Sequence, residues 1–363
     1  MDTKVLKYSV GIDISKDELE ICFKSLQKGQ ETKVKGTRKF PNTKKGFLQV
    51  NNWIGKRYKD KTIPLVVVVE ATGVYHEKVS YYLHKSGYCV VIILPNQSNS
   101  YLKSLGIKSK TDSIDSKGLA QMGIERKLRI WTPPNAELME LRSLTRHKNN
   151  LQKTKTELKN RLHAQQNSEH PSKMVVKQLK SQIRTMDNHL NSIDKSIKAL
   201  LENQSLFNDK IKKISSSIKG IGVDTVVSIV AETNGFELFR SQGQLISYSG
   251  YDIVENQSGK RNGKTKISKK GNSHIRKSLY FPALNMVRYN VEPFTSLYNR
   301  VFERTKIKMK GYVAVQRKLL CMVYTLWKKD QTFDPEIFKE QQKSTLYEIS
   351  IEKCLSSSFC VSL

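Results

Sequence analysis

The chain has 363 residues, of which 38% are hydrophobic, so it can bury a sizeable core and is long enough for two or three domains. Its 63 Lys and Arg against 33 Asp and Glu give a formal charge of +30, which favours a polyanionic partner, nucleic acid first. Five scattered cysteines without paired spacing argue against a disulfide framework and against a zinc site.

Two other interpretations fit the basic balance. A merely basic soluble protein would show it too. A membrane surface would also attract basic residues, but the sequence has neither an amphipathic basic helix nor a lipid-anchor signal. It shows no basic-then-apolar signal segment, and its longest apolar run, Leu65–Val69, is too short to span a bilayer. We therefore expect an intracellular, cytoplasmic protein associated with the nucleoid and not with a membrane.

The apolar pattern of residues 1–130 predicts a mixed α/β domain. Tyr8–Phe23 alternates apolar and polar residues like two strands joined at Ser15–Glu18. Pro64–Glu70 is a β-branched run typical of a strand buried on both faces. A helix is expected over His76–Ser86, where Gly87 ends it, and YCVVIILP then forms another buried strand. The predicted order is strand, strand, strand, helix, strand.

The helical pattern of residues 131–210 predicts a linker and assembly region made of helices. It opens at Pro133 and Pro134, and Asn167–Ser172 separates two helical stretches. The second stretch carries a heptad seam at Leu179, Ile183, Met186, Leu190, Ile193, Ile197 and Leu200. The first has Leu141, Leu144, Leu151, Leu158 and Leu162, with Lys148 and Lys155 interrupting the seam. An antiparallel hairpin, a coiled coil shared between subunits and an intramolecular helical spacer all fit this pattern.

Residues 211–335 form the predicted C-terminal domain, and residues 336–363 form a tail of unknown role. In SSSIKGIGVDTVVSIVAE, Gly220 and Gly222 stand between two apolar helical stretches, a spacing that resembles a helix-hairpin-helix. The backbone amides of such a turn face a phosphate and bind it without sequence preference. A simple glycine-containing helix turn has the same pattern.

Four acidic residues of the first domain form a candidate metal site: Asp13, Glu70, Asp112 and Asp115. Asp13 and Glu70 share one sheet edge if their strands are neighbours, and Asp112 and Asp115 lie on one face at the start of a helix. Carboxylates suit Mg²⁺ or Mn²⁺, and paired divalent ions neutralise the charge that develops in phosphodiester chemistry. Alternatively, Asp112 is a helix cap and Asp13 a turn residue.

A second candidate site is the basic segment 256–280, which holds eight Lys or Arg and no acidic residue. Its glycines indicate a loop, and its cations suit contacts to phosphates. Ser258 is the candidate nucleophile there, with Ser268 and Ser273 as competitors, because nearby cations stabilise an attacking alkoxide. A solvated flexible loop is the alternative. The candidate nucleic-acid contacts are Lys260, Arg261, Lys264, Lys266, Lys269, Lys270, Arg276, Gly220 and Gly222.

Five motifs follow one another between about residues 8 and 330: GIDISK, VVEATGVY, LPNQ with KTDSIDSKGLAQ, GIGVDTVVSIVAE, and SGYDIVENQSGK with ISKKGNSHIR. Together they resemble the DEDD insertion-sequence transposases of the Piv/MooV-like, or "IS one-ten", family. The resemblance implies an RuvC-like RNase H fold at the N-terminus and a transposase domain, mainly helical, at the C-terminus. It implies that Asp13, Glu70, Asp112 and Asp115 match the family's four metal-binding carboxylates and that Ser258 matches its catalytic serine.

The resemblance also implies partners. The serine of such enzymes becomes covalently joined to DNA while the carboxylates and Mg²⁺ complete the active site. The family is similar in using a structured non-coding bridge RNA to choose target and donor DNA, and its helical middle region serves assembly into dimers and tetramers. The chain departs from the family pattern in having Gln257-Ser258-Gly259-Lys260 where a Ser-Ser-Gly-Gly type of run is common, and in its tail, where no motif follows Gln341.

Three rival functions fit parts of the sequence. An RuvC-like junction nuclease would cut DNA with water and need no serine nucleophile. Actin-like sugar or acetate kinases also open with a GID-type strand, but their phosphate loop is Gly-rich where this chain has Ile14 and Ser15. A non-catalytic nucleic-acid-binding protein would tolerate the loss of Asp13 or Glu70.

Overall fold

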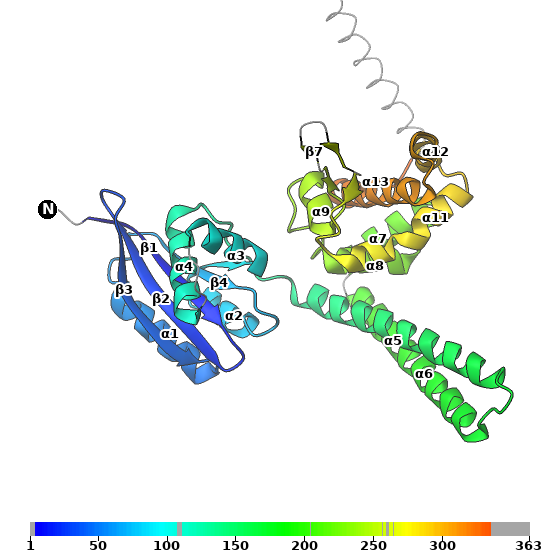
Figure 1. Cartoon of the computed structure of the whole chain (residues 1–363), viewed down its shortest axis with the longest axis horizontal. Coiled ribbons are helices and arrows are strands. Elements are labelled where there is room, and N and C mark those ends of the chain that lie inside the picture. The colour runs from blue at the N-terminus through cyan, green and yellow to red at the C-terminus, as the bar shows by residue number, and fades with distance from the viewer. Residues whose placement is uncertain are drawn as a thin grey trace, which may run out of the picture. The chain divides into compact units, whose positions relative to one another are not determined.

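The computed structural model describes residues 4–106, 111–203, 205–255, 257–258, 261–263 and 265–334. The chain divides into two compact units, Met1–Pro133 and Pro134–Leu363 (Figure 1). The finer predicted limits at residues 210 and 335 stay predictions. None of the helices in the described ranges combines the length and the hydropathy that a bilayer span requires.

A five-stranded mixed sheet with the order β3-β2-β1-β4-β5 forms the centre of the first unit. The strands are β1 (Val5–Ile14), β2 (Glu18–Gln27), β3 (Thr32–Pro41), β4 (Leu65–Glu70) and β5 (Cys89–Ile93). The first three are antiparallel neighbours, whereas β4 is parallel to β1 and β5 is parallel to β4. This mixture of antiparallel and parallel neighbours confirms the predicted mixed α/β class.

Helices cover both faces of this sheet (Figure 1). They are α1 (Lys44–Arg57), α2 (Glu77–Lys85), α3 (Pro95–Ser104) and α4 (Asp112–Glu125). Side chains of α1 and α2 join one apolar cluster with the sheet, and side chains of α3 and α4 join another with residues such as Val68 and Val91. Because β4 and β5 are buried by both clusters, they read as continuous β-branched runs. The helix predicted over His76–Ser86 is confirmed as α2.

The second unit begins with a long helical hairpin, α5 (Ala136–Gln166) and α6 (Lys173–Asn203). Lys148 of α5 pairs with Asp194 of α6 at 2.7 Å, and Lys155 pairs with Asp187. The partner numbers fall as the lysine numbers rise, so the two helices are antiparallel. The lysines that interrupt the predicted seam therefore form ion pairs across the hairpin.

The apolar seam of this hairpin is buried or half-buried within one chain. Leu179, Ile193 and Ile197 are each less than a tenth exposed. The structure therefore shows the intramolecular antiparallel hairpin among the three alternatives that the heptads allow. A coiled coil shared between subunits stays a prediction.

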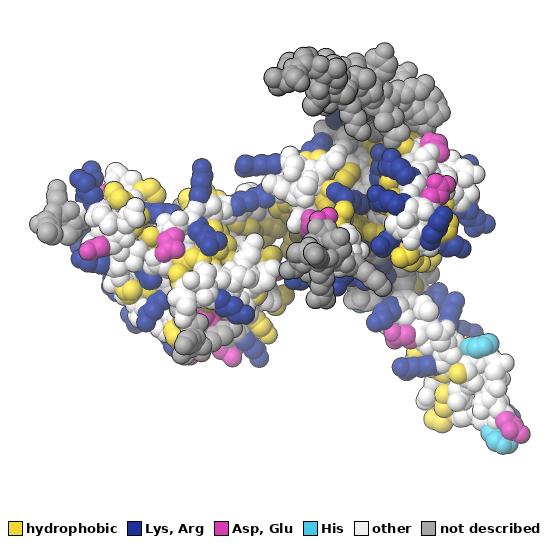
Figure 2. Space-filling model, turned by 45° about the horizontal axis from the view of Figure 1, so that its top comes forward, with side chains coloured by type: hydrophobic (Ala, Val, Ile, Leu, Met, Phe, Trp, Pro, Cys, Tyr) yellow, Lys and Arg dark blue, Asp and Glu magenta, His cyan; other side chains and the backbone are white. Residues whose placement is uncertain are grey.

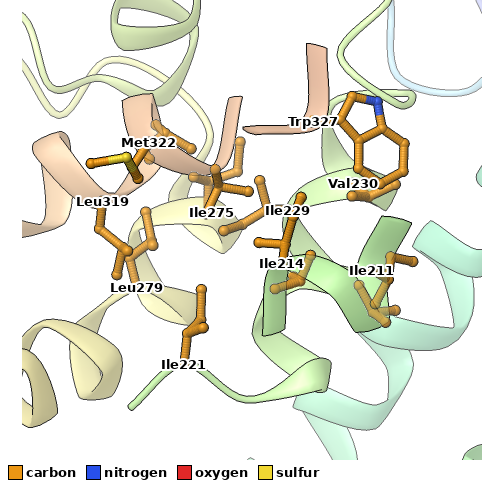
Figure 3. Packing of buried hydrophobic residues seen from close by; sticks show 14 of the residues in the cluster. Ile211, Ile214, Ile221, Ile229, Val230, Ile275, Leu279, Leu319, Met322 and Trp327 are labelled. Atoms are coloured by element: carbon orange, nitrogen blue, oxygen red, sulfur yellow. The ribbon is translucent and has the colours of Figure 1, made fainter. Parts of the chain in front are cut away.

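The rest of the second unit is mainly helical, as predicted. Its helices are α7 (Ser205–Ser217), α8 (Val223–Glu232), α9 (Gln242–Ser249), α10 (Ser273–Ser278), α11 (Tyr280–Arg288), α12 (Phe294–Thr305) and α13 (Lys308–Lys329). Figure 3 shows Ile214 of α7, Ile229 of α8, Ile275 of α10 and Leu319 of α13 pointing into one core. Tyr251 and Ile275, which flank the segment that contains Ser258, belong to this core.

Candidate functional site

Asp13 and Glu70 lie at the carboxyl ends of neighbouring parallel strands. In the β1–β4 ladder Ile12 lies beside Val69, and both side chains are fully buried. Asp13 and Glu70 are the next residues on their strands, so their side chains leave the opposite face of the sheet. Both residues are half-buried. The topology therefore places two carboxylates side by side on the face that α4 covers.

Helix α4 approaches this face unusually closely. A Cβ added to Gly11 would lie 2.1 Å from the backbone oxygen of Ser116 and 2.3 Å from the backbone nitrogen of Ala120. Only glycine leaves room for the helix backbone at this point of β1. Because Asp13 is two residues beyond Gly11 on the same face, the first turn of α4 lies beside the end of β1.

The first turn of α4 carries the other two carboxylates. Thr111 caps the helix, with its hydroxyl accepting a hydrogen bond from the Ile114 N–H at 3.3 Å. Asp112 is exposed and Asp115 is buried. The helix dipole favours negative charge at this end. The cap is thus Thr111, and Asp112 is not needed in that role.

Three of these carboxylates act electrostatically on the fourth, Asp13. Burial raises the pKa of Asp13 to about 6, and the charges of Asp115, Glu70 and Asp112 add to the rise, in that order. A hydrogen bond from the Ile14 N–H to Asp13 Oδ1 at 3.0 Å opposes it. Like charges gathered in a half-buried place raise a carboxyl pKa in this way. The structure thus places Asp115, Glu70 and Asp112 near enough to Asp13 for their charges to act on it.

The chemistry of this set fits a hard divalent cation. All four side chains offer oxygen, the ligand that Mg²⁺ and Mn²⁺ prefer, and their mutual repulsion is what a bound cation relieves. Within the described ranges, no three Asp, Glu, His or Cys side chains are arranged closely enough to hold one ion.

The sequence analysis missed Ser98, which contacts this set. Its side chain lies on α3 and the residue is 1% exposed. The Ser98 hydroxyl donates a hydrogen bond to Glu70 Oε2 at 2.6 Å. This bond fixes the direction of the Glu70 carboxylate. The available signal was its position directly after the LPNQ motif that follows a buried strand, but nothing in the sequence pairs it with Glu70.

Ser258 lies on a β-hairpin in the second unit. β6 (Ile253–Val254) pairs with β9 (Lys266–Ile267), and β7 (Gln257–Ser258) pairs with β8 (Arg261–Asn262), all antiparallel. Ser258 is paired with Arg261, so it stands at the tip of the hairpin. The segment expected as a loop thus contains paired strands. Lys260 and Lys264 lie outside the described residues.

A buried carboxylate contacts the start of the helix that follows this hairpin. Glu232 of α8 is 1% exposed and accepts two hydrogen bonds from the Arg146 guanidinium, at 2.6 and 2.8 Å. Its Oε2 also accepts a hydrogen bond from the Asn272 side-chain amide at 2.7 Å. Burial opposes the charge, but these bonds hold the pKa of Glu232 below its usual range. Asn272 is also the cap of α10, so Glu232 connects α5, α8 and the start of α10, the helix that follows the hairpin.

The remaining predicted contacts fall into two groups. Lys266, Lys269 and Lys270 are exposed on or just after the hairpin. Arg276 is half-buried, and its guanidinium donates a hydrogen bond to the Ser249 backbone oxygen at 2.8 Å, which gives it a structural role. Ser268 accepts a hydrogen bond from the Lys270 N–H, and it is not at the hairpin tip.

The glycine turn between α7 and α8 has a defined packing. Gly220 has φ +98°, a conformation that favours glycine, and lies against Asn285 and Tyr289 of the neighbouring helix. Gly222 is the cap position of α8 and provides no side-chain hydrogen bond there. Both a helix-hairpin-helix and a simple glycine turn have this geometry, so phosphate binding stays a prediction.

Two family models match most of this chain. A model of DEDD IS110 type, described as a transposase, matches residues 10–171. A second model, described as the transposase IS116/IS110/IS902 family, matches residues 212–299. The chain belongs to the IS110 family of transposases. As predicted from the ordered motifs, this IS110-family transposase is a DNA transposase or recombinase, with DNA as its partner.

Relatives of this IS110-family transposase include two curated proteins. The pilin gene-inverting proteins of Moraxella bovis and Moraxella lacunata are each 27% identical over 336 residues, covering 91% of this chain and 99% of theirs. Two solved structures of Thermus thermophilus RuvC, one with a Holliday junction substrate, are 12% identical and cover 34% of this chain and 99% of theirs. Their TM-scores, 0.26 and 0.27, are too low to support an argument.

Proposed function

We propose that this transposase cuts and rejoins DNA strands to move an insertion sequence, with Asp13, Glu70, Asp112 and Asp115 holding Mg²⁺, or Mn²⁺, and Ser258 as the nucleophile. The observation that carries the proposal is the close contact of α4 with Gly11, because it gathers the four carboxylates at the ends of β1 and β4. The names of the Moraxella relatives support it, because inverting a gene also requires DNA strands to be cut and rejoined.

The metal, when bound, would neutralise charge on the attacking and leaving oxygens of the phosphodiester. Asp13, Glu70, Asp112 and Asp115 would hold it, and Ser98 would keep Glu70 aimed at it through the 2.6 Å hydrogen bond. Asp115 itself is 6% exposed, so it would meet a bound metal from the protein side.

Ser258 would carry out the covalent step. Its hydroxyl oxygen bonds to phosphorus and gives up its proton, while the DNA oxygen that leaves phosphorus takes up a proton. A hydroxyl of the new DNA end then attacks the phosphoserine ester, forms the new phosphodiester and returns the serine. Because an ester is exchanged for an ester, the bond energy is conserved and ATP is not needed.

The charge distribution supports a nucleic-acid partner. Figure 2 shows Lys and Arg side chains spread over the drawn face of both units, with few Asp or Glu among them. Such a surface suits backbone contacts, and we propose that target and donor DNA are chosen by pairing with a bridge RNA, as in other members of the family. Assembly into dimers and tetramers belongs to the same proposal.

The serine step is tested with Ser258→Ala. The wild type is incubated with a plasmid carrying the element's own ends and Mg²⁺, and the covalent protein–DNA adduct and the rejoined product are quantified. The variant should form neither adduct nor product while it binds DNA normally. Strand cutting that persists in Ser258→Ala and in Ser268→Ala would instead indicate a water-dependent junction nuclease, the second candidate function.

A further inference from the structure

An exposed row of aromatic and basic side chains runs along α10 and α11. The two helices are continuous in hydrogen bonding, because the Leu279 N–H donates to Ile275 and the Ala283 N–H donates to Leu279. Residues four and seven or eight apart on such a helix share a face. Lys277, Phe281 and Arg288 therefore lie in one row. We call this row, together with Tyr280, Tyr289 and Lys219 beside it, the α11 stripe.

The aromatic side chains of this stripe are unusually exposed. Phe281 is 70% exposed, and Tyr280 beside it is 38% exposed. Their rings meet edge to face with centroids 5.3 Å apart, so the pair is held together while its outer faces stay open. Two large rings exposed side by side form an apolar area on this helix that a partner could cover.

The stripe continues to the glycine turn before α8. Tyr289, at the end of α11, is 47% exposed, and the Lys219 ammonium lies 5.5 Å from its ring centroid. The Asn285 side chain donates a hydrogen bond to the Gly220 backbone oxygen at 3.4 Å. Rings at both ends of α11 thus alternate with the cations of Lys219, Lys277 and Arg288.

We propose that the α11 stripe binds a nucleic-acid strand with unpaired bases, which stack on Phe281 and Tyr289 while Lys277, Arg288 and Lys219 contact its phosphates. The proposal goes beyond strand transfer and does not depend on Ser258 as a nucleophile. Exposed rings interleaved with cations are what single strands bind, since every base has a face that can stack. No acidic residue occurs from Asn256 to Val291, so the charge around the stripe complements phosphate.

The rings decide between kinds of nucleic acid. Cations alone would serve a duplex equally well, but a duplex keeps its bases stacked on one another and offers none to Phe281. The shared chemistry is an unpaired base on a phosphate backbone, which either an RNA loop or a melted DNA strand supplies. An anionic membrane and a second copy of the chain are the competing occupants.

The test uses the full chain and short single strands containing one 5-iodouracil, as RNA and as DNA. Ultraviolet cross-linking followed by peptide mapping should identify a peptide with Phe281 or Tyr289. Phe281→Ala should weaken binding of both single strands about tenfold, while an abasic strand of equal length and a blunt duplex bind unchanged. Phe281→Trp should restore the affinity.

Met309→Ala is the matched control, because Met309 is 49% exposed on another helix of the same unit. It should leave single-strand binding unchanged. Equal weakening of the abasic strand by Phe281→Ala, or no weakening at all, would overturn the proposal. So would a Phe281→Ala variant that loses only binding to phosphatidylserine vesicles or only self-association in sedimentation. If Phe281→Ala weakens RNA binding more than DNA binding, or the reverse, the proposal is supported and the preferred kind of strand is identified.

Discussion

At the residue scale, the charge of Asp13 opposes folding in the absence of a metal. Burial and three neighbouring carboxylates raise its folded pKa from 3.8 to about 6. The folded chain therefore binds this proton more tightly than the unfolded chain, and stability falls as the pH rises through that range. Residues that a protein places at such a cost are typical of functional sites.

Asp13→Asn should therefore stabilise the metal-free protein at pH 8 while it abolishes strand cutting. After allowance for solvent screening we expect a gain on the order of 1 kcal/mol, seen as a melting temperature a few degrees higher. At pH 5 the gain should shrink, because Asp13 is then largely protonated in the folded wild type. A variant that melts lower at pH 8, or whose gain grows on acidification, contradicts this electrostatic account.

At the element scale, the position of α4 depends on the missing side chain of Gly11. Gly11→Ala would put a Cβ 2.1 Å from the Ser116 oxygen, so α4 must shift away. We expect a destabilisation of about 2 kcal/mol or more and a loss of strand cutting. Gly55→Ala is the control, because nothing lies within 4 Å of the added atom on α1. It should be neutral or slightly stabilising. Equal denaturation midpoints for the two variants would refute the close-contact argument.

We expect the conformation of the hairpin that contains Ser258 to depend on Glu232, which bonds to Asn272 just after the hairpin. Glu232→Gln weakens the hydrogen bonds to Arg146 and Asn272, so backbone amides of residues 250–269 should exchange hydrogen at least about tenfold faster. Asp187→Asn removes an ion pair of the same helix α5 that does not contact the hairpin. It should leave that exchange unchanged. Matching exchange rates in the wild type and Glu232→Gln would show that the carboxylate does not anchor the hairpin.

The sequence predicted those elements whose burial pattern is local. The β-branched run of β4 and the heptads of α6 both record which faces are covered. β3 was missed because it is an edge strand in which only Phe40 is buried, so it lacks alternation. α1 was missed although its buried Phe47, Val50 and Ile54 follow helical spacing. The partners of Ser98 and Glu232 were also beyond reach, since they lie 28 to 86 residues away in the chain.

At the scale of the whole molecule, the charge of +30 governs how the protein holds nucleic acid. Each phosphate contact steepens the dependence of affinity on salt by about 0.9 in the logarithmic slope. The triple variant Lys266→Ala, Lys269→Ala, Lys270→Ala should reduce the slope by about 2 to 3 for duplex DNA. A triple variant of exposed lysines on α6, Lys177→Ala, Lys180→Ala, Lys195→Ala, makes the same charge change and should reduce it less. Equal salt slopes for the two triple variants would show that the hairpin lysines contribute no more to duplex binding than lysines of α6.

We propose that this transposase cuts DNA with a divalent metal held by the four carboxylates of β1, β4 and α4. The most direct measurement is strand cutting of a plasmid carrying the element's ends, with Mg²⁺ and with EDTA, by the wild type, Asp115→Asn and Glu18→Gln. Glu18 is an exposed carboxylate of the same unit, paired with Lys39. We predict Mg²⁺-dependent cutting by the wild type and Glu18→Gln and none by Asp115→Asn. Undiminished cutting by Asp115→Asn, or by the wild type in EDTA, would contradict the account.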